Sequence, residues 1–343
     1  MTDERRSEPP VRSSRRRRRI APGFNFFTLG AFFVVVSALG LYLATRQQEA
    51  NVERVGELSG VMADGDGSFV NYLLVGSDTR QGADPNSPDY GGIGDTTETG
   101  GNRSDTIIVL HVDNDRGAAS IMSIPRDLWV EIPGYGTDRV NVAYTYGPDV
   151  LVQTVQTALG VPINHYIEVD FFSFKDIIGA LGGVDLCFEH PTRDLNTGLW
   201  IGEPGCYNLG PVMSLAYARS RYYEENRTGE WEVDGSADLG RVTRQQKFLQ
   251  AAVAKAAEQM AANPLRASDL INAAVGSLRV DPGTNLVESA EFLRPLAAGG
   301  LARYTLPTVP DEIGGKSVLV LAADAPGVLR YFAGLDEPPA PNG

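Results

Sequence analysis

Two arginine–aspartate pairs stand at the same end of one predicted β-hairpin. Arg103 and Asp105 come just before an apolar run rich in β-branched residues, 106–112, which predicts a strand. The next predicted strand ends at Arg126 and Asp127. Because an antiparallel hairpin brings the start of one strand beside the end of the next, the four charges should meet at one sheet edge. The alternative is two surface salt bridges, since exposed ion pairs are common and weak.

Two further arginine pairs lie at the ends of predicted helices. Arg219 and Arg221 close one helix, and Arg241 and Arg244 share a face in the first turn of a long one, 239–262. Cations at a helix N-terminus oppose the macrodipole unless an anion sits between them and the free N–H groups. A phosphate is favoured there by the dipole and by bidentate arginine. A solvated basic face is the alternative for this pair.

Two aspartates complete the chemistry that these residues permit. Asp78 follows a short apolar strand, 71–76, and Asp105 precedes the strand described above. Two carboxylates beside a pyrophosphate are a usual way to hold Mg²⁺. Metal and arginine together neutralise a migrating phosphoryl group, so the pattern indicates phosphoryl transfer.

The sequence lacks the motifs of several common enzyme classes. It contains no G-x-S-x-G, no P-loop, no G-x-G-x-x-G after a strand and no H-E-x-x-H. The three histidines stand apart, and His111 lies within a predicted strand as a core side chain. The net charge of the 343 residues is −13, although residues 1–19 hold eight arginines. So acidic a body argues against nucleic-acid binding.

The N-terminal segment predicts a membrane anchor. Residues 24–44 are apolar and uncharged, long enough to span a bilayer, and five arginines precede them. We therefore expect a basic, disordered cytoplasmic tail over 1–23, a transmembrane helix over 24–44 and a stalk over 45–69. The protein would lie in the cell membrane with a single pass, its N-terminus cytoplasmic and its main domain outside. A cleaved signal peptide is the alternative.

The rest of the chain predicts one α/β domain over 70–335, followed by a loose Pro-rich tail over 336–343. We expect strands at 71–76, 106–112, 118–124, 128–132, 164–169, 184–188, 303–307 and 317–321, and helices at 148–159, 171–181, 213–222, 239–262, 267–278, 286–296 and 325–332. Irregular segments are expected at 81–101, 190–209 and 223–237. Outside the membrane Cys187 and Cys206 should form a disulfide; two buried thiols are the alternative.

Several motifs, in order, give the chain a family resemblance. VGSDTR, RSDTIIVLHVD, SIPRDLWVEIPG, LAYARSR and DLGRVTRQQKFLQA, with the segments between them, resemble the LytR-CpsA-Psr family over about residues 70–260. The resemblance implies an α-β-α arrangement around a mixed sheet with an apolar groove for a lipid. It also implies a Mg²⁺-dependent phosphotransferase. Such an enzyme moves a glycopolymer from a polyprenyl-pyrophosphate carrier to peptidoglycan, at a muramic acid 6-hydroxyl.

The resemblance assigns roles by motif. Asp78 and Asp105 are similar to the metal-binding acids. Arg126, Arg219 and Arg221 are similar to the pyrophosphate clamp, and with Asp105 they form the expected catalytic set. Arg241, Arg244 and Gln245 would bind the pyrophosphate from its far side. Arg103 would be a further ligand. Either Asp127 or Asp105 would assist deprotonation of the acceptor hydroxyl.

Two departures from the family pattern concern substrate choice. Extra residues at 81–101 and 223–237 flank the expected site. The cysteine pair and the basic tail suggest an actinobacterial envelope, with an arabinogalactan-like or other secondary wall polymer as donor. Two other functions remain open: a polyprenyl-pyrophosphate phosphatase that uses water as acceptor, and a non-catalytic protein that binds the lipid pyrophosphate.

Overall fold

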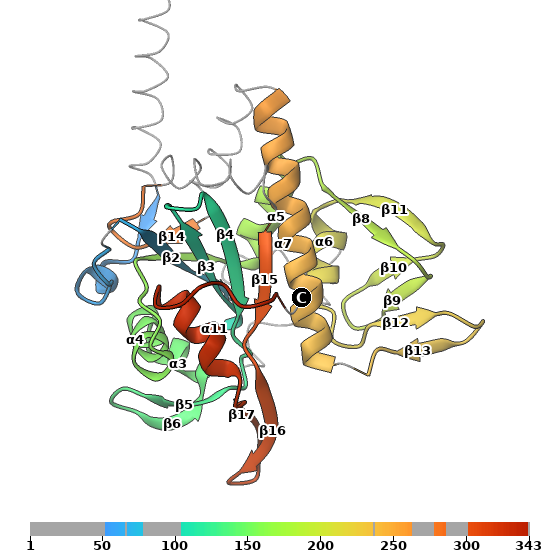
Figure 1. The fold of residues 1–343 in the computed structure, drawn as a ribbon. Coiled ribbons are helices and arrows are strands. Elements are labelled where there is room, and N and C mark those ends of the chain that lie inside the picture. Colours follow the sequence, from blue (N-terminus) through green and yellow to red (C-terminus); the bar gives the residue numbers. More distant parts are fainter. Residues whose placement is uncertain are drawn as a thin grey trace, which may run out of the picture. The chain divides into compact units, whose positions relative to one another are not determined.

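The computed structural model describes residues 52–65, 67–77, 104–235, 237–262, 278–285 and 301–341 (Figure 1). They belong to one compact unit that begins at Gln47. The predicted tail over 1–23 and the predicted span over 24–44 lie outside these residues. Within the described ranges, no helix has the length and apolarity needed to cross a bilayer.

A seven-stranded mixed sheet forms the centre of the domain. Its order is β1 (Glu53–Arg54), β14 (Leu278–Val280), β7 (His165–Val169), β2 (Phe69–Ser77), β3 (Ser104–Asp113), β4 (Ala118–Ser123) and β15 (Leu301–Thr305). The central strands β2, β3 and β4 run antiparallel, whereas β7 and β15 join them in parallel. The mixed sheet predicted from the sequence is confirmed.

The hairpin of β3 and β4 has the predicted arrangement. Ile108 pairs with Ser123, and Gly117 adopts φ +60° in the connecting turn, where a side chain would be strained. The start of β3 therefore lies at the same sheet edge as the end of β4. His111, as predicted, is a core side chain, 2% exposed, whose Nδ1 is 2.8 Å from Asn71 Oδ1.

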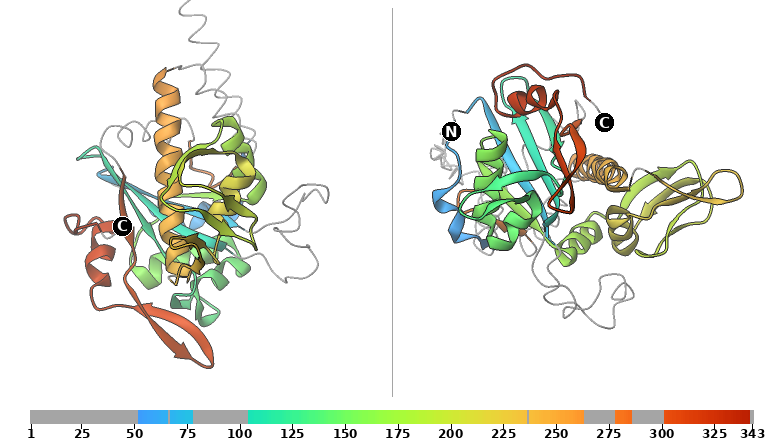
Figure 2. Two further views of the ribbon diagram at one scale, coloured as in Figure 1. Left: turned by 90° about the vertical axis from the view of Figure 1, so that its right-hand side faces the viewer. Right: turned by 90° about the horizontal axis from the view of Figure 1, so that it is seen from below.

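Helices cover both faces of this sheet (Figures 1 and 2). On one face α3 (Val140–Tyr146), α4 (Pro148–Leu159) and α11 (Ala325–Phe332) close the larger apolar core. On the other face lie α5 (Phe171–Ala180), α6 (Pro211–Arg219) and α7 (Ala237–Ala262). The alternation of sheet residues between the two cores, such as Leu73 and Tyr72, gives the expected α-β-α layers.

A second, four-stranded sheet was not predicted. It has the order β10 (Leu199–Ile201), β9 (Thr192–Asp194), β12 (Glu224–Asn226) and β13 (Trp231–Val233). Figure 2 shows it on the far side of α6 and α7 from the seven-stranded sheet. The prediction of irregular structure at 190–209 and 223–237 was wrong, because strands of three residues are too short to show a period of two.

Three two-stranded elements complete the described fold. These are β8 (Val184–Phe188) with β11 (Gly205–Leu209), β5 (Trp129–Ile132) with β6 (Gly136–Arg139), and β16 (Thr308–Ile313) with β17 (Lys316–Leu321). Cys187 and Cys206 lie directly opposite each other in the first pair and form a disulfide, as predicted.

Both ends of the predicted domain require correction. Residues expected in a stalk are packed into the domain: β1 pairs with β14, the short 3-10 helix Gly56–Gly60 follows it, and Val55 and Leu58 are buried in the larger core. The C-terminal tail is also tied down, because Glu337 pairs with Arg116 and the carbonyl of Pro339 accepts from Tyr304. The apolar residues of the predicted stalk are too few for a visible pattern. The helices predicted at 267–278 and 286–296 lie outside the described residues, except that Leu278 opens β14.

Candidate functional site

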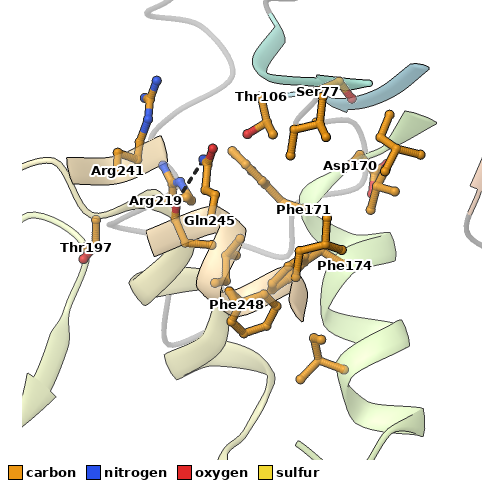
Figure 3. Close-up of a pocket in the computed structure, with 18 of the residues that line it drawn as sticks. Ser77, Thr106, Asp170, Phe171, Phe174, Thr197, Arg219, Arg241, Gln245 and Phe248 are labelled. Atoms are coloured by element: carbon orange, nitrogen blue, oxygen red, sulfur yellow. Dashed lines mark hydrogen bonds between the residues drawn. The ribbon is translucent and has the colours of Figure 1, made fainter. Parts of the chain in front are cut away.

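One pocket collects most of the described residues that were expected to act on a pyrophosphate. It has a volume of about 610 Å³ and lies between α5, α6 and α7, against the ends of β2 and β3 (Figure 3). Its lining divides into an apolar part and a polar part. Both α6 and α7 contribute to each part, whereas α5 contributes only apolar side chains.

The apolar part is lined mainly by side chains of α5 and α7. Phe174 and Phe248 pack against each other in its wall, with ring centroids 5.3 Å apart. The amphipathic helix α5 begins here because Asp170 caps it, accepting hydrogen bonds from the amides of Phe172 and Ser173 at 3.0 and 2.8 Å. The remaining apolar lining consists of Leu74, Val75, Ile108, Val169, Phe171, Ile177, Ile178, Leu181, Leu215, Leu249 and Ala252.

The polar part brings four arginines and a glutamine together. These are Arg126, Arg219, Arg221, Arg241 and Gln245, from the end of β4, the end of α6 and the first turns of α7. In Figure 3 the labelled arginines lie to one side of the aromatic rings. Such a concentration of guanidinium groups in an acidic chain is complementary to a multiply charged anion.

Arg219 joins the two parts of the pocket. Its guanidinium carbon lies 4.5 Å from the centre of the Phe171 ring, within the range of a cation–π contact. Gln245 Nε2 donates to the carbonyl of Ala218 at 3.1 Å, which links α7 to the last turn of α6 (Figure 3). The pocket is therefore positively charged directly where its apolar lining begins.

Arg126 enters the pocket from the seven-stranded sheet. Its carbonyl accepts from the amide of Asn141 at 3.2 Å, and its Nε lies 3.4 Å from Asp127 Oδ2. Asp127 is also 3.5 Å from Arg139 and is not part of the pocket lining. Asp127 thus forms an ion pair with each of two arginines, and the pair with Arg139 was not indicated by the sequence.

The strand ends beside Arg126 contain a β-bulge. Gly76 pairs with Thr106 but Ser77 pairs with Ser104, so Asp105 is the extra residue of β3. Bulges of this kind are frequent next to active sites. Asp78, Arg103 and the side chain of Asp105 lie outside the described residues.

The polar atoms near this bulge fit a hard cation. The hydroxyl of Ser104 is buried and has no hydrogen-bond partner among the described residues. An oxygen without a partner, at strand ends that lead into Asp78 and Asp105, is consistent with an oxygen-ligated Mg²⁺. The described residues alone hold no group of three or more histidine, cysteine or carboxylate side chains that could bind a metal.

Arg244 does not line the pocket, contrary to the expectation. Its side chain is 8% exposed, donates to Asp234 Oδ2 at 2.9 Å and to the carbonyl of Ser220 at 2.8 Å, and lies 4.4 Å from the ring of Tyr223. Residues three apart on a helix differ by about 60° in direction. That difference places Arg241 in the pocket and Arg244 beneath the segment that follows α6.

Asp194 is a site residue that the sequence did not reveal. It is fully buried at the end of β9 and lines the pocket. Its Oδ2 accepts from the hydroxyl of Ser220 at 2.6 Å and from the amides of Arg221 and Tyr222, each at 3.0 Å. Its Oδ1 accepts from the amide of Asn196 at 2.9 Å. The Asp-Leu-Asn-Thr-Gly sequence indicates a turn, but nothing in it indicates the contact with Arg221.

Gln246 does not line the pocket but connects the elements that form it. Its side chain is 1% exposed, and Nε2 donates to Ser123 Oγ and to the carbonyl of Tyr304, both at 2.9 Å. These bonds tie α7 to the end of β4, just before Arg126. The relative placement of Arg241 and Arg126 thus depends on a buried amide to which the sequence analysis gave no role, although it stands in the motif DLGRVTRQQKFLQA.

Known proteins resemble this chain in sequence. A model described as the LytR_cpsA_psr family matches residues 39–327. LcpB, a probable cell wall biosynthesis protein of Corynebacterium glutamicum, is 35% identical over 69% of this chain and 54% of LcpB. TagU of Oceanobacillus iheyensis, named as a polyisoprenyl-teichoic acid–peptidoglycan teichoic acid transferase, is 30% identical over 66% of this chain and 65% of TagU. The chain thus spans less than two thirds of either relative.

Solved structures agree with this result. The LytR-Csp2A-Psr enzyme from Actinomyces oris superposes with a TM-score of 0.64 and 25% identity, covering 82% of this chain and 96% of that enzyme. The family model spans most of the chain, from residue 39 to residue 327. The resemblance inferred from the motifs is confirmed, and the chain belongs to the LytR-CpsA-Psr family.

Proposed function

We propose that the chain is a membrane-anchored phosphotransferase. It moves a glycopolymer from a polyprenyl-pyrophosphate carrier to peptidoglycan, at a muramic acid 6-hydroxyl, during cell-wall assembly. The observation that carries the proposal is the single pocket in which four arginines meet an apolar cavity lined by phenylalanines. A lipid pyrophosphate likewise consists of an apolar chain joined to a multiply charged anion. The names of TagU and LcpB support wall assembly.

The arginines would act on the pyrophosphate in two ways. Arg219 and Arg221 approach from α6 and Arg126 from β4, so they hold the anion between them. The acceptor hydroxyl gives its proton to Asp105 or Asp127 as it attacks the phosphorus that carries the sugar. The P–O–P bond breaks, and polyprenyl phosphate leaves with the electron pair. Charge that develops on the leaving phosphate is stabilised by the same guanidinium groups, which are already in place. Arg241 and Gln245 would complete this shell.

A divalent cation fits the strand ends beside Arg126. Asp78 and Asp105 would hold Mg²⁺, which supplies further neutralisation of the pyrophosphate. The bulge at Asp105 and the Ser104 hydroxyl support this assignment. Substitution of either aspartate should weaken Mg²⁺-dependent binding of the lipid pyrophosphate as well as turnover.

The proposed location follows from the N-terminal sequence. Residues 24–44 would form a single membrane span, with residues 1–23 in the cytoplasm and the catalytic domain on the outer face. The part of the lipid next to the pyrophosphate would then occupy the apolar part of the pocket, while the rest of the tail stays in the bilayer. Protease treatment of intact cells should digest the catalytic domain and spare the tail.

The full chain is tested with a short polyprenyl-pyrophosphoryl sugar, Mg²⁺ and peptidoglycan oligomers. We expect released polyprenyl phosphate and a phosphodiester-linked adduct, both lost with EDTA and in Arg126→Ala. Arg116→Ala is the matched control, because Arg116 lies in the turn at the opposite end of the same hairpin, paired with Asp113. Lipid phosphate without an adduct would instead indicate the phosphatase, and Mg²⁺-dependent binding without turnover a non-catalytic protein.

A further inference from the structure

The four-stranded sheet has one face that carries a continuous row of side chains. Trp200 pairs with Arg193, Arg193 with Glu224, and Glu224 with Val233. Directly opposite residues in a sheet project from the same face. The row therefore crosses all four strands. We refer to this side as the outer face, which consists of Trp200, Arg193, Glu224, Val233, Asn226 and Trp231.

The outer face is turned to solvent. Trp200 is 55% exposed and Val233 is 57% exposed, whereas Leu199 and Ile201, which project from the other side, are buried in an apolar core. A tryptophan that served only to stabilise a small sheet would be covered by its neighbours. The exposure of Trp200 indicates a surface that receives a ligand.

The groups on this face suit a neutral sugar. The Trp200 and Trp231 ring centroids lie 5.7 Å apart with a 41° tilt, and the Arg193 guanidinium carbon lies 4.2 Å from the centre of the Trp231 ring. Arg193 Nε also donates to Glu224, so the charges of the pair cancel. The exposed indole of Trp200 can receive the C–H side of a pyranose, and Trp231 supports the guanidinium that lies over its ring. The fixed guanidinium and carboxylate would meet the sugar hydroxyls as donor and acceptor.

The turn between β9 and β10 connects the outer face to the pyrophosphate pocket. The turn between β9 and β10 contributes Asn196 and Thr197 to the pocket lining. Trp200 follows Thr197 by three residues, or about 10 Å along an extended chain. A sugar chain attached to a pyrophosphate at Arg221 would therefore cross this turn before it reached Trp200.

We propose that the outer face binds the sugar chain of the lipid-linked donor, at neutral sugars beyond the one attached to the pyrophosphate. The inference rests on the function proposed above and adds to it a basis for selecting polymers. It also gives a role to the segment 223–237, which supplies β12 and β13 and so both Glu224 and Trp231. The outer face would retain a donor that carries an extended chain in preference to a bare lipid-pyrophosphoryl sugar.

The test compares donors of two lengths on the full chain in detergent. One is farnesyl pyrophosphate carrying N-acetylglucosamine alone; the others carry three further glucosyl, galactosyl or mannosyl units. We expect at least one extended donor to bind about tenfold more tightly than the short one. Trp200→Ala and Trp231→Ala should remove that gain and leave the affinity for the short donor unchanged.

Three results would overturn the inference. The first is that no extended donor binds more tightly than the short donor. The second is that the tighter binding of the extended donor survives both tryptophan substitutions. The third is that Trp200→Ala raises the KM for peptidoglycan oligomers and leaves the ratio of affinities for extended and short donors unchanged. The last would assign the face to the acceptor. Tyr135→Ala is the control, since Tyr135 is 53% exposed in the turn between β5 and β6. If the short donor itself is neither bound nor used, the proposed function fails instead.

Discussion

The two larger sheets of this chain are stabilised by different means. The seven-stranded sheet is covered on both faces, and its central strands are apolar runs such as β3, whose Ile107 and Val109 face one core while Ile108 faces the other. The four-stranded sheet buries only one face. Its position depends on polar links, above all those of Asp194 and of Arg244. Apolar burial fixes the first sheet, and directional bonds fix the second.

Both sheets nevertheless supply the same pocket. Arg126 follows a strand of the larger sheet. Arg219 ends α6, and Arg221 lies in the segment after it, which is held by Asp194 of the smaller sheet. Arg126 is therefore fixed by a well-packed apolar core, whereas Arg221 is fixed by a few hydrogen bonds. Loss of those hydrogen bonds should displace Arg221 and leave the seven-stranded sheet folded.

The largest expected effect is on turnover, from Arg219→Ala. This removes a guanidinium that approaches the proposed pyrophosphate from α6, and its cation–π contact with Phe171. Loss of one preorganised donor to a developing charge lowers kcat by about 100- to 1000-fold. Transfer rates with wild-type and variant chains measure it. A variant that retains more than a tenth of the rate would contradict the assigned role, provided that its thermal unfolding is unchanged.

Asp194→Ala should reduce both stability and activity. It leaves the buried hydroxyl of Ser220 and the amides of Arg221 and Tyr222 without their acceptor. Each unsatisfied buried donor costs about 1–3 kcal/mol, so we expect a loss of about 3 kcal/mol in the free energy of unfolding. Urea denaturation measures it. Asp185→Ala is the matched control, because that carboxylate is exposed and pairs with Lys255 at the surface.

Removal of the disulfide should affect the region of the smaller sheet first. Cys187 and Cys206 are 19 residues apart and join β8 to β11. Replacing both by serine should lower the free energy of unfolding by about 3 kcal/mol, mainly because the unfolded chain gains freedom. Two of the three tryptophans, Trp200 and Trp231, lie in the smaller sheet, so their fluorescence reports on it. An unchanged unfolding midpoint would refute this prediction.

Acid should weaken the larger sheet through His111. Burial is the main cause that lowers the pKa of His111 to about 4. The unfolded chain then binds a proton at higher pH than the folded chain, so this stability is present above about pH 6.5 and is lost as the pH falls toward 4. Between pH 7.5 and pH 5 the loss is about 2 kcal/mol. His111→Gln should lose correspondingly less in urea titrations; an identical pH dependence would exclude the mechanism.

Much of the larger sheet followed from local pattern. The β-branched runs predicted β2, β3 and β4 to within a few residues, and α11 was predicted at its observed bounds. The gathering of Arg126, Arg219, Arg221, Arg241 and Gln245 was also anticipated, because each stands at the end of an element where motifs place it. A long run of apolar residues, and the position of a residue at the end of such a run, can be read directly from a sequence.

The failures share a physical cause. Residues 52–60 were expected in a stalk, although Val55 and Leu58 belong to the larger core. A few apolar side chains in a polar segment have no period, and their burial depends on β14, more than 200 residues away. The strands β9 and β12 have three residues each, too few to show a period. They also pair with each other from segments about 30 residues apart in the chain.

By itself, the sequence determined which charges this protein has and at which ends of its helices and strands they stand. Only the tertiary structure decided which of two similar charges on one helix enters the pocket. Arg241 and Arg244 are alike in type and neighbouring in sequence, yet one lines the pocket and the other is held by Asp234 and Ser220. The reason is that the environment of a helical side chain depends on which elements pack against that side of the helix. Here those elements are positioned by Asp194, Gln246 and the four-stranded sheet.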